Sequence, residues 1–310
     1  MVEETRDAPS RSVNPFREGS PPAATPPRAG HDSPAFHFVR QLAMDLAEGE
    51  FDLPPFPDTA LKVQACINDP DSDITSLAAI VAREPALAAR LMRMSNSAMM
   101  RRGPMEVTDI PTAISRVGMD MVQNVAVSFA AREAFRTPPG SPCVADLNAL
   151  RQESVRVAAF AYAIACHVGY IRNPDEAMLA GLLNAVGKFY IFTRAADHPE
   201  LFADRQLLVG LLEQWHTGVA RAIVESWNFP ESIAVAVDEQ EVRERDRIAS
   251  ADLSDVLFVA NHLARSGSEA VATLGDADAL ARLRLTADSL AAILAEDEEK
   301  IRSLVEALSA

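Results

Sequence analysis

Apolar residues with helical spacing follow one another from Phe36 almost to the end of the chain, separated by capping residues and prolines. Leu87, Leu91 and Met94 form one such stripe at positions i, i+4 and i+7. Asp109 precedes a helical pattern with proline in its first turn, which is the arrangement that helix starts favour. No run with the two-residue period of a strand reaches a useful length. The pattern therefore predicts an all-α fold.

The composition agrees with close-packed helices. The chain has 310 residues, of which 48% are apolar but only 6% are aromatic, and Ala, Leu and Val dominate. Ala and Leu lose little conformational freedom in a helix, so such a core suits helices better than sheets. The length allows one large domain or two small ones.

Two proline-rich stretches divide the chain. Residues 1–34 are rich in Pro, Ser, Ala and Arg and lack apolar periodicity. Burial cannot offset the entropy of ordering them, so we expect a disordered tail. Residues 137–142, Thr-Pro-Pro-Gly-Ser-Pro, cannot be helical. They predict a joint between an N-terminal helical lobe, about 35–136, and a C-terminal lobe, about 143–310.

In the C-terminal half the periodicity predicts several long helices. One lies near Leu147–His167, and another runs from the Asn173 cap through the Tyr190 region. The last helix, Ala287–Leu308, carries an apolar stripe that caps the core or pairs with a second copy, so a homodimer stays open. Its acidic run, 296–299, is interpreted as a solvated face.

The overall charge argues against several classes of partner. The formal net charge is −15, which repels a phosphate backbone and an anionic membrane, so we expect no nucleic acid and no membrane surface as partners. The sequence contains no stretch of about 20 apolar residues, so we expect no membrane-spanning helix. Three cysteines without metal-site spacing fit a reducing compartment. We therefore expect a cytoplasmic protein.

The segment Ile110–Phe129 has the outline of a helix-turn-helix, with Gly118 at the turn. A second helix that reads DNA needs basic or amide side chains on its exposed face. This one offers only Gln123 and Asn124 and no basic residue between Asp120 and Ser128. The sequence therefore argues against DNA binding.

A set of short segments occurs in a characteristic order and spacing along the chain. They are Leu53–Pro57, Asn68–Asp71, Glu84–Leu87, Met94–Ala98, Ile110–Ile114, Val117-Gly118, Ala180–Leu183, Gly187-Lys188, and His216 with Trp227 and Pro230. Together they resemble the HDOD domain, the HD-related output domain of bacterial signalling proteins, over roughly residues 36–300. The resemblance implies an all-α array of helices whose second lobe is an HD-like bundle.

The resemblance also implies a position for each metal ligand of the parent HD phosphohydrolases: a His, a His-Asp pair and a later Asp. Here Glu153 stands at the first position, Asn184 and Ala185 at the pair, and Asn261 at the last. Asn is a weak neutral ligand and Ala offers none, so the set would hold a divalent ion poorly. We expect a degenerate cleft with no metal and no cofactor. Where relatives often carry a tandem His pair, this chain has Asp238-Glu239.

Two further residues are candidates for the degenerate cleft. His216 matches a histidine that recurs in the family, but such a histidine is more often a satisfied structural residue. Lys188, one of three lysines, could bind an anion, or it could balance the dipole at a helix C-terminus. The polar pair Asn96-Ser97 is interpreted as a helix C-terminus rather than as a site.

The expected function is that of a non-enzymatic regulatory domain in bacterial signal transduction that acts by protein–protein interaction. The HDOD resemblance implies this role, through a groove between the lobes or through the degenerate cleft. Two alternatives stay open. One is a metal-dependent phosphohydrolase with relocated ligands, such as Glu153, His216 and Asp238. The other is a nucleotide-sensing module in which Lys188 and nearby arginines hold a phosphate.

Overall fold

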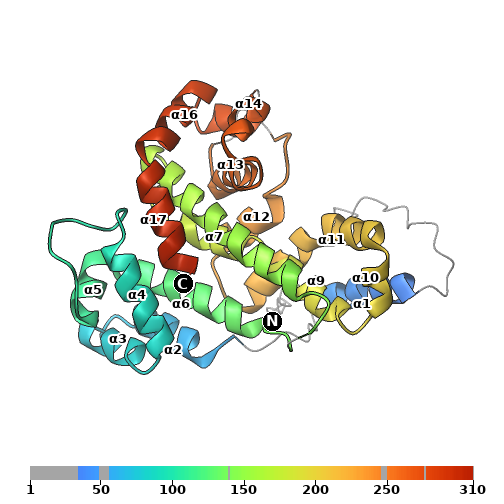
Figure 1. Cartoon of the computed structure of the whole chain (residues 1–310), viewed down its shortest axis with the longest axis horizontal. Coiled ribbons are helices and arrows are strands. Elements are labelled where there is room, and N and C mark those ends of the chain that lie inside the picture. Colours follow the sequence, from blue (N-terminus) through green and yellow to red (C-terminus); the bar gives the residue numbers. More distant parts are fainter. Residues whose placement is uncertain (1–33, 49–55, 139, 246–249, 276, 310) are drawn as a thin grey trace, which may run out of the picture.

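The computed structural model describes residues 34–48, 56–138, 140–245, 250–275 and 277–309 (Figure 1). The predicted disordered tail therefore lies outside the described residues, except for Pro34, which begins the first helix. The segment Leu53–Pro55, part of the first motif of the resemblance, also lies outside them.

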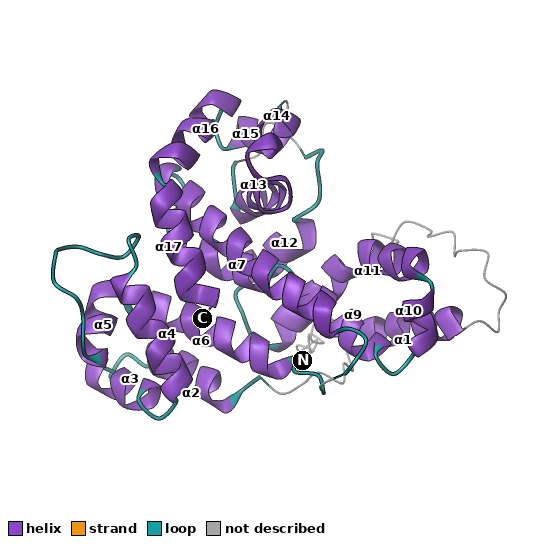
Figure 2. Ribbon diagram, in the orientation of Figure 1, coloured by secondary structure: helices purple, strands orange, loops and turns teal. Residues whose placement is uncertain are grey.

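The described residues form helices and loops and contain no strand (Figure 2). The predicted all-α fold is thus confirmed. The helices of the first half are α1 (Pro34–Glu48), α2 (Asp58–Asn68), α3 (Ile74–Val81), α4 (Pro85–Asn96), α5 (Ile110–Val117) and α6 (Met119–Ala134). Those of the second half are α7 (Val144–His167), α8 (Pro174–Leu183), α9 (Val186–Ala195), α10 (Pro199–Ala203), α11 (Arg205–Ser226), α12 (Glu231–Glu239), α13 (Leu253–Ser266), α14 (Ala270–Leu274), α15 (Asp278–Arg282), α16 (Ala287–Glu296) and α17 (Glu298–Ser309). Within the described ranges, no helix is long and apolar enough to cross a membrane.

The long helix α7 runs through the middle of the molecule and packs against α8, α13 and α17 (Figure 1). Helices α2–α6 pack together on one side of it, whereas α1 leaves them and packs against α10 and α11. At the other end of the chain, α17 contacts α4 as well as α7. The two halves of the sequence are therefore interleaved in space, and the lobe boundaries near 136 and 143 stay a prediction.

The capping residues identified in the sequence begin the helices as expected. Asp109 and Asn173 each accept a hydrogen bond from a backbone N–H in the first turn, at Thr112 and Asp175 respectively. Asp73 caps α3 in the same way, through Ser76. These bonds satisfy donors that a helix start otherwise leaves without a partner. Gly118 adopts φ 92° between α5 and α6, a left-handed conformation that favours glycine. The polar pair at the end of α4 also has a structural role, because Asn96 exchanges two hydrogen bonds with the backbone of Val107.

Two predicted helices are each divided into two. The pattern from Asn173 to Tyr190 becomes α8 and α9, with the break at Asn184 and Ala185. The last pattern becomes α16 and α17, with the break at Asp297. Asp297 is 3% exposed and its carboxylate contacts His167 Nε2 at 2.9 Å and Lys300. The interpretation of the acidic run 296–299 as a solvated face is therefore wrong at Asp297. Its carboxylate is buried, and His167 and Lys300 supply the partners that a buried charge needs.

Two glycines set how closely the helices approach. A Cβ placed on Gly187 would lie 2.0 Å from the carbonyl oxygen of His216, and one on Gly181 would lie 2.5 Å from Cα of Ala158. Helix α9 therefore packs backbone to backbone on α11, and α8 does so on α7. These glycines belong to the segments that carry the resemblance, and the contacts give a physical reason for them.

The first turn of α8 contains a carboxyl group that predicts a pH-dependent stability. Burial, with the negative charge of Asp120, raises the pKa of Asp175 from 3.8 to about 6. The folded state therefore holds a proton that the unfolded state has already lost between these values, so stability falls as pH rises through that window. Replacing Asp175 by asparagine should remove this dependence and raise the free energy of unfolding at pH 7 by about 1–2 kcal/mol, because solvent screens part of the effect. Urea unfolding at a series of pH values measures it, and an unchanged pH profile would contradict the assignment.

Candidate functional site

A cleft of about 540 Å³ opens between α7, α9, α11, α13 and the segment after α12. Its walls combine apolar and charged side chains. The lining residues are Asp146, Ala149, Leu150, Glu153, Lys188, Phe192, Arg205, Val209, Leu212, Glu213, His216, Glu241 and Arg265. Three residues predicted from the sequence, Glu153, Lys188 and His216, thus lie together here.

Glu241 is the centre of the charged groups in this cleft. One carboxylate oxygen lies 3.2 Å from His216 Nε2, and the other lies 2.9 Å from Arg265 Nη2 and 3.9 Å from Lys188 Nζ. Arg265 also bonds Glu153, at 3.1 Å from its Nε. Each carboxylate in this group therefore has a cationic or hydrogen-bonding partner within the cleft.

The environment fixes the protonation states of these groups. The hydrogen bond from His216, with the charges of Arg265 and Lys188, holds the pKa of Glu241 well below its usual range. Burial lowers the pKa of His216, whose side chain is 1% exposed, and burial also lowers the pKa of Lys188. A neutral His216 that donates from Nε2 to Glu241 leaves a bare Nδ1, and that atom is buried with no hydrogen bond among the described residues. The arrangement favours a fixed Glu241 carboxylate and a neutral imidazole.

Gln240, the residue before Glu241, belongs to a cluster of three buried amide side chains, which we call the amide cluster: Asn184, Gln240 and Asn261. Asn184 Nδ2 donates to Asn261 Oδ1 at 2.8 Å, and Asn261 Nδ2 donates to Gln240 Oε1 at 3.0 Å. Gln240 Nε2 donates to the backbone oxygen of Asn184 at 2.9 Å, which closes the ring. Each of the three residues is at most 3% exposed. The amides therefore bind each other where the HDOD resemblance implies metal ligands.

The donor set does not fit a divalent metal ion. Asn184 Oδ1 is the one oxygen of the cluster that accepts no hydrogen bond among the described residues, and a single neutral oxygen is a poor ligand. Ala185 is buried at the start of α9 and offers no side-chain ligand, while Glu153 is held by Arg265. Within the described residues, no three His, Cys, Asp or Glu side chains are placed to share an ion.

The two alternative sets of site residues are also not favoured by the geometry. Asp238 is not among the residues that line the cleft, and its carboxylate instead lies 3.5 Å from Arg221 Nη1. The cleft around Lys188 also contains Glu153, Glu213 and Glu241, which offset its charge for an incoming phosphate. Lys188 lies in the first turn of α9, so the interpretation as a cation at a helix C-terminus is wrong.

Sequence reasoning missed three residues of this region: Gln240, Glu241 and Arg265. Arg265 lies four residues after Asn261 on α13, so helical spacing was a signal for it. The other two follow directly after Asp238-Glu239, which stand where relatives often carry a tandem His pair. Helix α12 ends at Glu239, and the chain turns there. The turn buries Gln240 and places Glu241 at the cleft, and no pattern in the sequence indicated it.

In the helix pair with the outline of a helix-turn-helix, α5 and α6, the amide of Asn124 has a structural role. Asn124 on α6 is 2% exposed and its Nδ2 donates to the backbone oxygen of Asp175 at 2.7 Å. It joins α6 to the start of α8, so it is not available for a base edge.

The amide cluster gives a stability prediction. Replacing Asn261 by alanine leaves Asn184 Nδ2 and Gln240 Oε1 buried without partners, so the free energy of unfolding should fall by about 2–3 kcal/mol. Urea unfolding followed by circular dichroism measures the loss. Gln214, an exposed amide on α11, is the matched control, and its alanine variant should change stability by about 0.5 kcal/mol or less. Equal small effects of both variants would contradict the role given to the cluster.

Comparisons with known proteins agree with this architecture. A crystal structure from Shewanella amazonensis SB2B, described provisionally as a metal-dependent phosphohydrolase, is 24% identical, with a TM-score of 0.75 over 88% of this chain and 99% of that one. One from Marinobacter aquaeolei VT8, described provisionally as a signal transduction protein, is 20% identical, with a TM-score of 0.57 over 90% of this chain and 67% of that one. At these identities the likeness shows the fold alone.

Two comparisons concern the sequence. An uncharacterized protein of Treponema pallidum (strain Nichols) is 25% identical over 205 residues, which are 62% of this chain and 38% of that protein. The chain thus matches well under half the length of this curated relative. The HDOD domain family matches residues 53–242, more than half of the chain, and includes α2–α12 with His216 and Glu241. The cleft and the amide cluster therefore lie largely within the matched region, and the chain belongs to the HDOD domain family.

Proposed function

We propose that this chain is a non-enzymatic regulatory domain of bacterial signalling that binds a protein partner through the cleft around Glu241. Membership of the HDOD family fits a regulatory role, and so does the likeness to a structure described provisionally as a signal transduction protein. The proposed setting is the cytoplasm, where Cys66, Cys143 and Cys166, all free thiols, would stay reduced.

The amide cluster is the observation that carries the non-enzymatic part of the proposal. Hydrolysis by an HD-type site needs ligands that converge on an ion and activate a water molecule. Here the side chains at those positions hydrogen-bond each other, and the carboxylate of Glu153 is paired with Arg265. The buried amides keep the helices in register without offering charged ligands.

A gain-of-binding variant tests this part. Restoring the ligand types with Glu153→His, Asn184→His, Ala185→Asp and Asn261→Asp should create a Mn²⁺ site that calorimetric titration detects, provided that circular dichroism shows a folded variant. The wild-type chain should show no saturable Mn²⁺ binding under the same conditions. Saturable binding by the wild type with phosphomonoester turnover would contradict the proposal.

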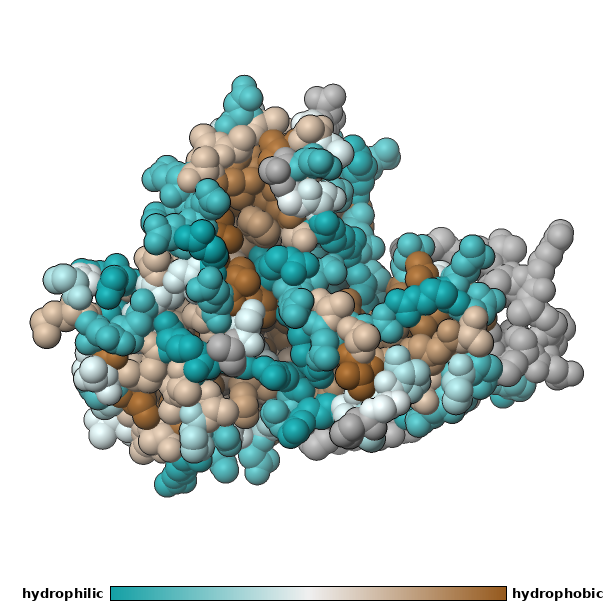
Figure 3. Space-filling view, viewed as in Figure 1, coloured by the Kyte–Doolittle hydropathy of each residue, from teal (hydrophilic) through white to brown (hydrophobic). Residues whose placement is uncertain are grey.

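The mixed character of the cleft supports docking of a protein segment. Val209 is 40% exposed at its rim, beside Phe192, Leu212 and the charged groups around Glu241. Apolar contacts would supply affinity, and the paired charges would select the partner. On the face seen in Figure 3, hydrophobic residues also reach the surface over α13, α14 and α16, among hydrophilic ones, and a second copy of the chain could bind there.

A capture experiment tests the docking part. The tagged chain should retain a specific partner from an extract of its native cells, and Val209→Glu should abolish this retention, because it places a fifth carboxylate, beside Asp146, Glu153, Glu213 and Glu241, at an apolar position of the cleft. The matched control is Met105→Glu, in the loop between α4 and α5, where the side chain is 78% exposed. Equal retention by wild type and both variants would contradict docking at the cleft.

A further inference from the structure

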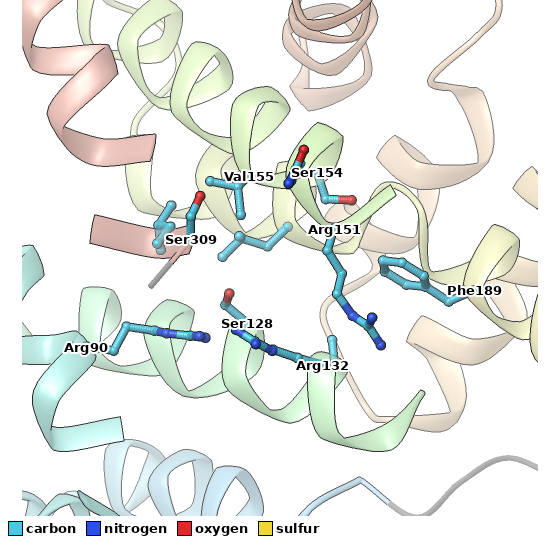
Figure 4. Close-up of a pocket in the computed structure, with 12 residues that line it drawn as sticks. Arg90, Ser128, Arg132, Arg151, Ser154, Val155, Phe189 and Ser309 are labelled. Carbon is cyan, nitrogen blue, oxygen red and sulfur yellow. The ribbon is translucent and has the colours of Figure 1, made fainter. Parts of the chain in front are cut away.

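Two further pockets lie outside the cleft around Glu241. The smaller, between α4, α6 and α7, is lined by residues such as Arg90, Ser128 and Arg132 and has a volume of about 80 Å³ (Figure 4). The larger has a volume of about 350 Å³ and shares no lining residue with the cleft. Pockets that hold small molecules have volumes of about 300–1,000 Å³, so the larger one has room for an organic ligand.

The larger pocket lies where three helices begin, and we call it the three-helix pocket. Helices α8, α12 and α13 pack against one another, and the first turn of each lines the pocket together with the segment before α8. The polar lining residues of the three helix starts are Asn173 and Glu176 at α8, Glu231 and Ser232 at α12, and Asp252 and Ser254 at α13.

The three helix starts differ in how they are capped. Asn173 caps α8 and Asp252 caps α13, because their side chains accept hydrogen bonds from the N–H groups of Asp175 and Asp255. Helix α12 follows Pro230, which provides no side-chain cap. The first backbone N–H groups of a helix attract negative charge when nothing caps them. The start of α12 therefore favours an acceptor that a ligand brings.

Two of the three carboxylates in this pocket are already paired with arginines. Glu231 lies 2.7 Å from Nη2 of Arg221, and Asp252 lies 2.8 Å from Nη2 of Arg245. Glu176 has no such cationic partner among the described residues. Its carboxylate is thus the one in the pocket whose charge is not balanced by a neighbouring side chain.

Arg172, in the segment before α8, is the matching cation. It lines the pocket, is exposed, and forms no ion pair with Glu176 or with another residue that the structure describes. Glu176 is held in place by a hydrogen bond that the hydroxyl of Ser232 donates to it. The pocket therefore offers one cation and one anion, which are the charges that a zwitterion needs.

A buried hydroxyl in the same pocket also lacks a partner. Ser254 is 2% exposed and lines the pocket, yet its hydroxyl makes no hydrogen bond to any part of the chain that the structure describes. A buried hydroxyl without a partner has lost its bonds to water, so a ligand that replaces them is favoured. This observation is independent of the charges and also indicates a bound molecule.

We propose that the three-helix pocket binds a free α-amino acid with an apolar side chain. Arg172 and the uncapped start of α12 would bind the carboxylate, and Glu176 would bind the ammonium group, since charge-assisted hydrogen bonds are the strong ones. Ser254 would supply a further hydrogen bond. The pocket is also lined by Ile171, Val235 and Leu253, which suit an apolar side chain.

The position of the pocket gives the binding a structural consequence. The helices that begin at the pocket also carry the amide cluster, because Asn184 follows α8, Gln240 follows α12 and Asn261 lies on α13. An amino acid bound between the three helix starts would favour the packing that brings these amides together. This inference does not depend on the proposed function of the cleft.

Calorimetric titration of the full chain at pH 7 tests the site, with L-leucine and L-valine as probes. We expect one site per chain. Two analogues of leucine test whether both charges are recognised: L-leucinamide lacks the carboxylate, and 4-methylpentanoate lacks the ammonium group. Each should bind at least about tenfold more weakly than leucine, because it leaves one charged group of the pocket without its counterpart.

Two variants assign these charges to residues. Arg172→Gln and Glu176→Gln should each weaken the binding of leucine by about tenfold or more, and circular dichroism shows whether they are folded. Arg172→Gln should leave the affinity for L-leucinamide unchanged, since that analogue has no carboxylate to lose a partner. Arg302→Gln is the matched control, because Arg302 is also exposed but lies on α17 and does not line the pocket. Its affinity for leucine should equal that of the wild type.

Three results would overturn the proposal. One is the absence of binding to both amino acids at about 10 mM, because an affinity weaker than this is no specific site. Another is equal affinity for leucine and its two analogues, which would mean that the charges are not recognised. The third is equal affinity of the Arg172→Gln and Arg302→Gln variants for leucine.

Discussion

Replacing Arg282 by methionine is expected to lower the free energy of unfolding by about 3 kcal/mol, the lower part of the range for breaking a buried ion pair. Arg282 Nε lies 2.9 Å and 3.0 Å from the two carboxylate oxygens of Asp255, and both side chains are at most 1% exposed. Without Arg282 the carboxylate keeps Arg245, at 3.3 Å, as its one cationic partner among the described residues. Urea unfolding followed by far-ultraviolet circular dichroism measures the loss.

A double variant separates the effect of leaving a buried charge without its partner from the effect of changed packing. Changing Asp255 to leucine in the Arg282→Met background removes the buried charge, so the double variant should recover part of the lost stability. If Arg282→Met alone cost less than about 1 kcal/mol, the ion pair between α13 and α15 would not stabilise the fold as described.

Replacing Gly187 by alanine is expected to cost about 3 kcal/mol, because overpacking against backbone atoms cannot be relieved by a rotamer change. The added Cβ would lie 2.0 Å from His216 O and 2.8 Å from Ala220 N, so α9 and α11 would have to move apart. His216 and Lys188 face the cleft from these two helices, so the change should also disturb their contacts with Glu241. Thermal and urea unfolding measure the effect.

Gly210 on α11 is the matched control for this substitution. It is exposed, and nothing lies within 4 Å of a Cβ built on it. Alanine has a higher helix propensity than glycine, so Gly210→Ala should stabilise the chain by about 0.5–1 kcal/mol. The close contact between α9 and α11 would be contradicted if both glycine variants changed stability in the same direction.

The fold was predictable where local physics decides it. Caps such as Asp109 and Asn173, and the turn at Gly118, can be read from sequence because each acts within one helical turn. The breaks inside the predicted helices could not be predicted from the sequence, because they depend on tertiary contacts. Asp297 interrupts its helix where it meets His167, which is 130 residues away in the sequence.

Only part of the candidate site was predictable, because the rest depends on tertiary packing. The resemblance placed Asn184 and Asn261 at ligand positions, and the structure brings them into hydrogen-bond contact. It could not indicate that Gln240 completes the ring, or that Glu241 rather than Asp238 faces the cleft. Which way the chain turns after α12 is set by packing, and no helical period extends past a helix end.

The metal content of the purified chain shows whether hydrogen-bonded amides have replaced a metal site. The wild-type chain, purified after expression with added Mn²⁺ and Fe²⁺, is analysed for bound metal and assayed with a phosphomonoester. We expect far less than one ion per chain and no turnover above that of the Asn184→Ala variant. One or two ions per chain, with turnover that Asn184→Ala abolishes, would contradict it.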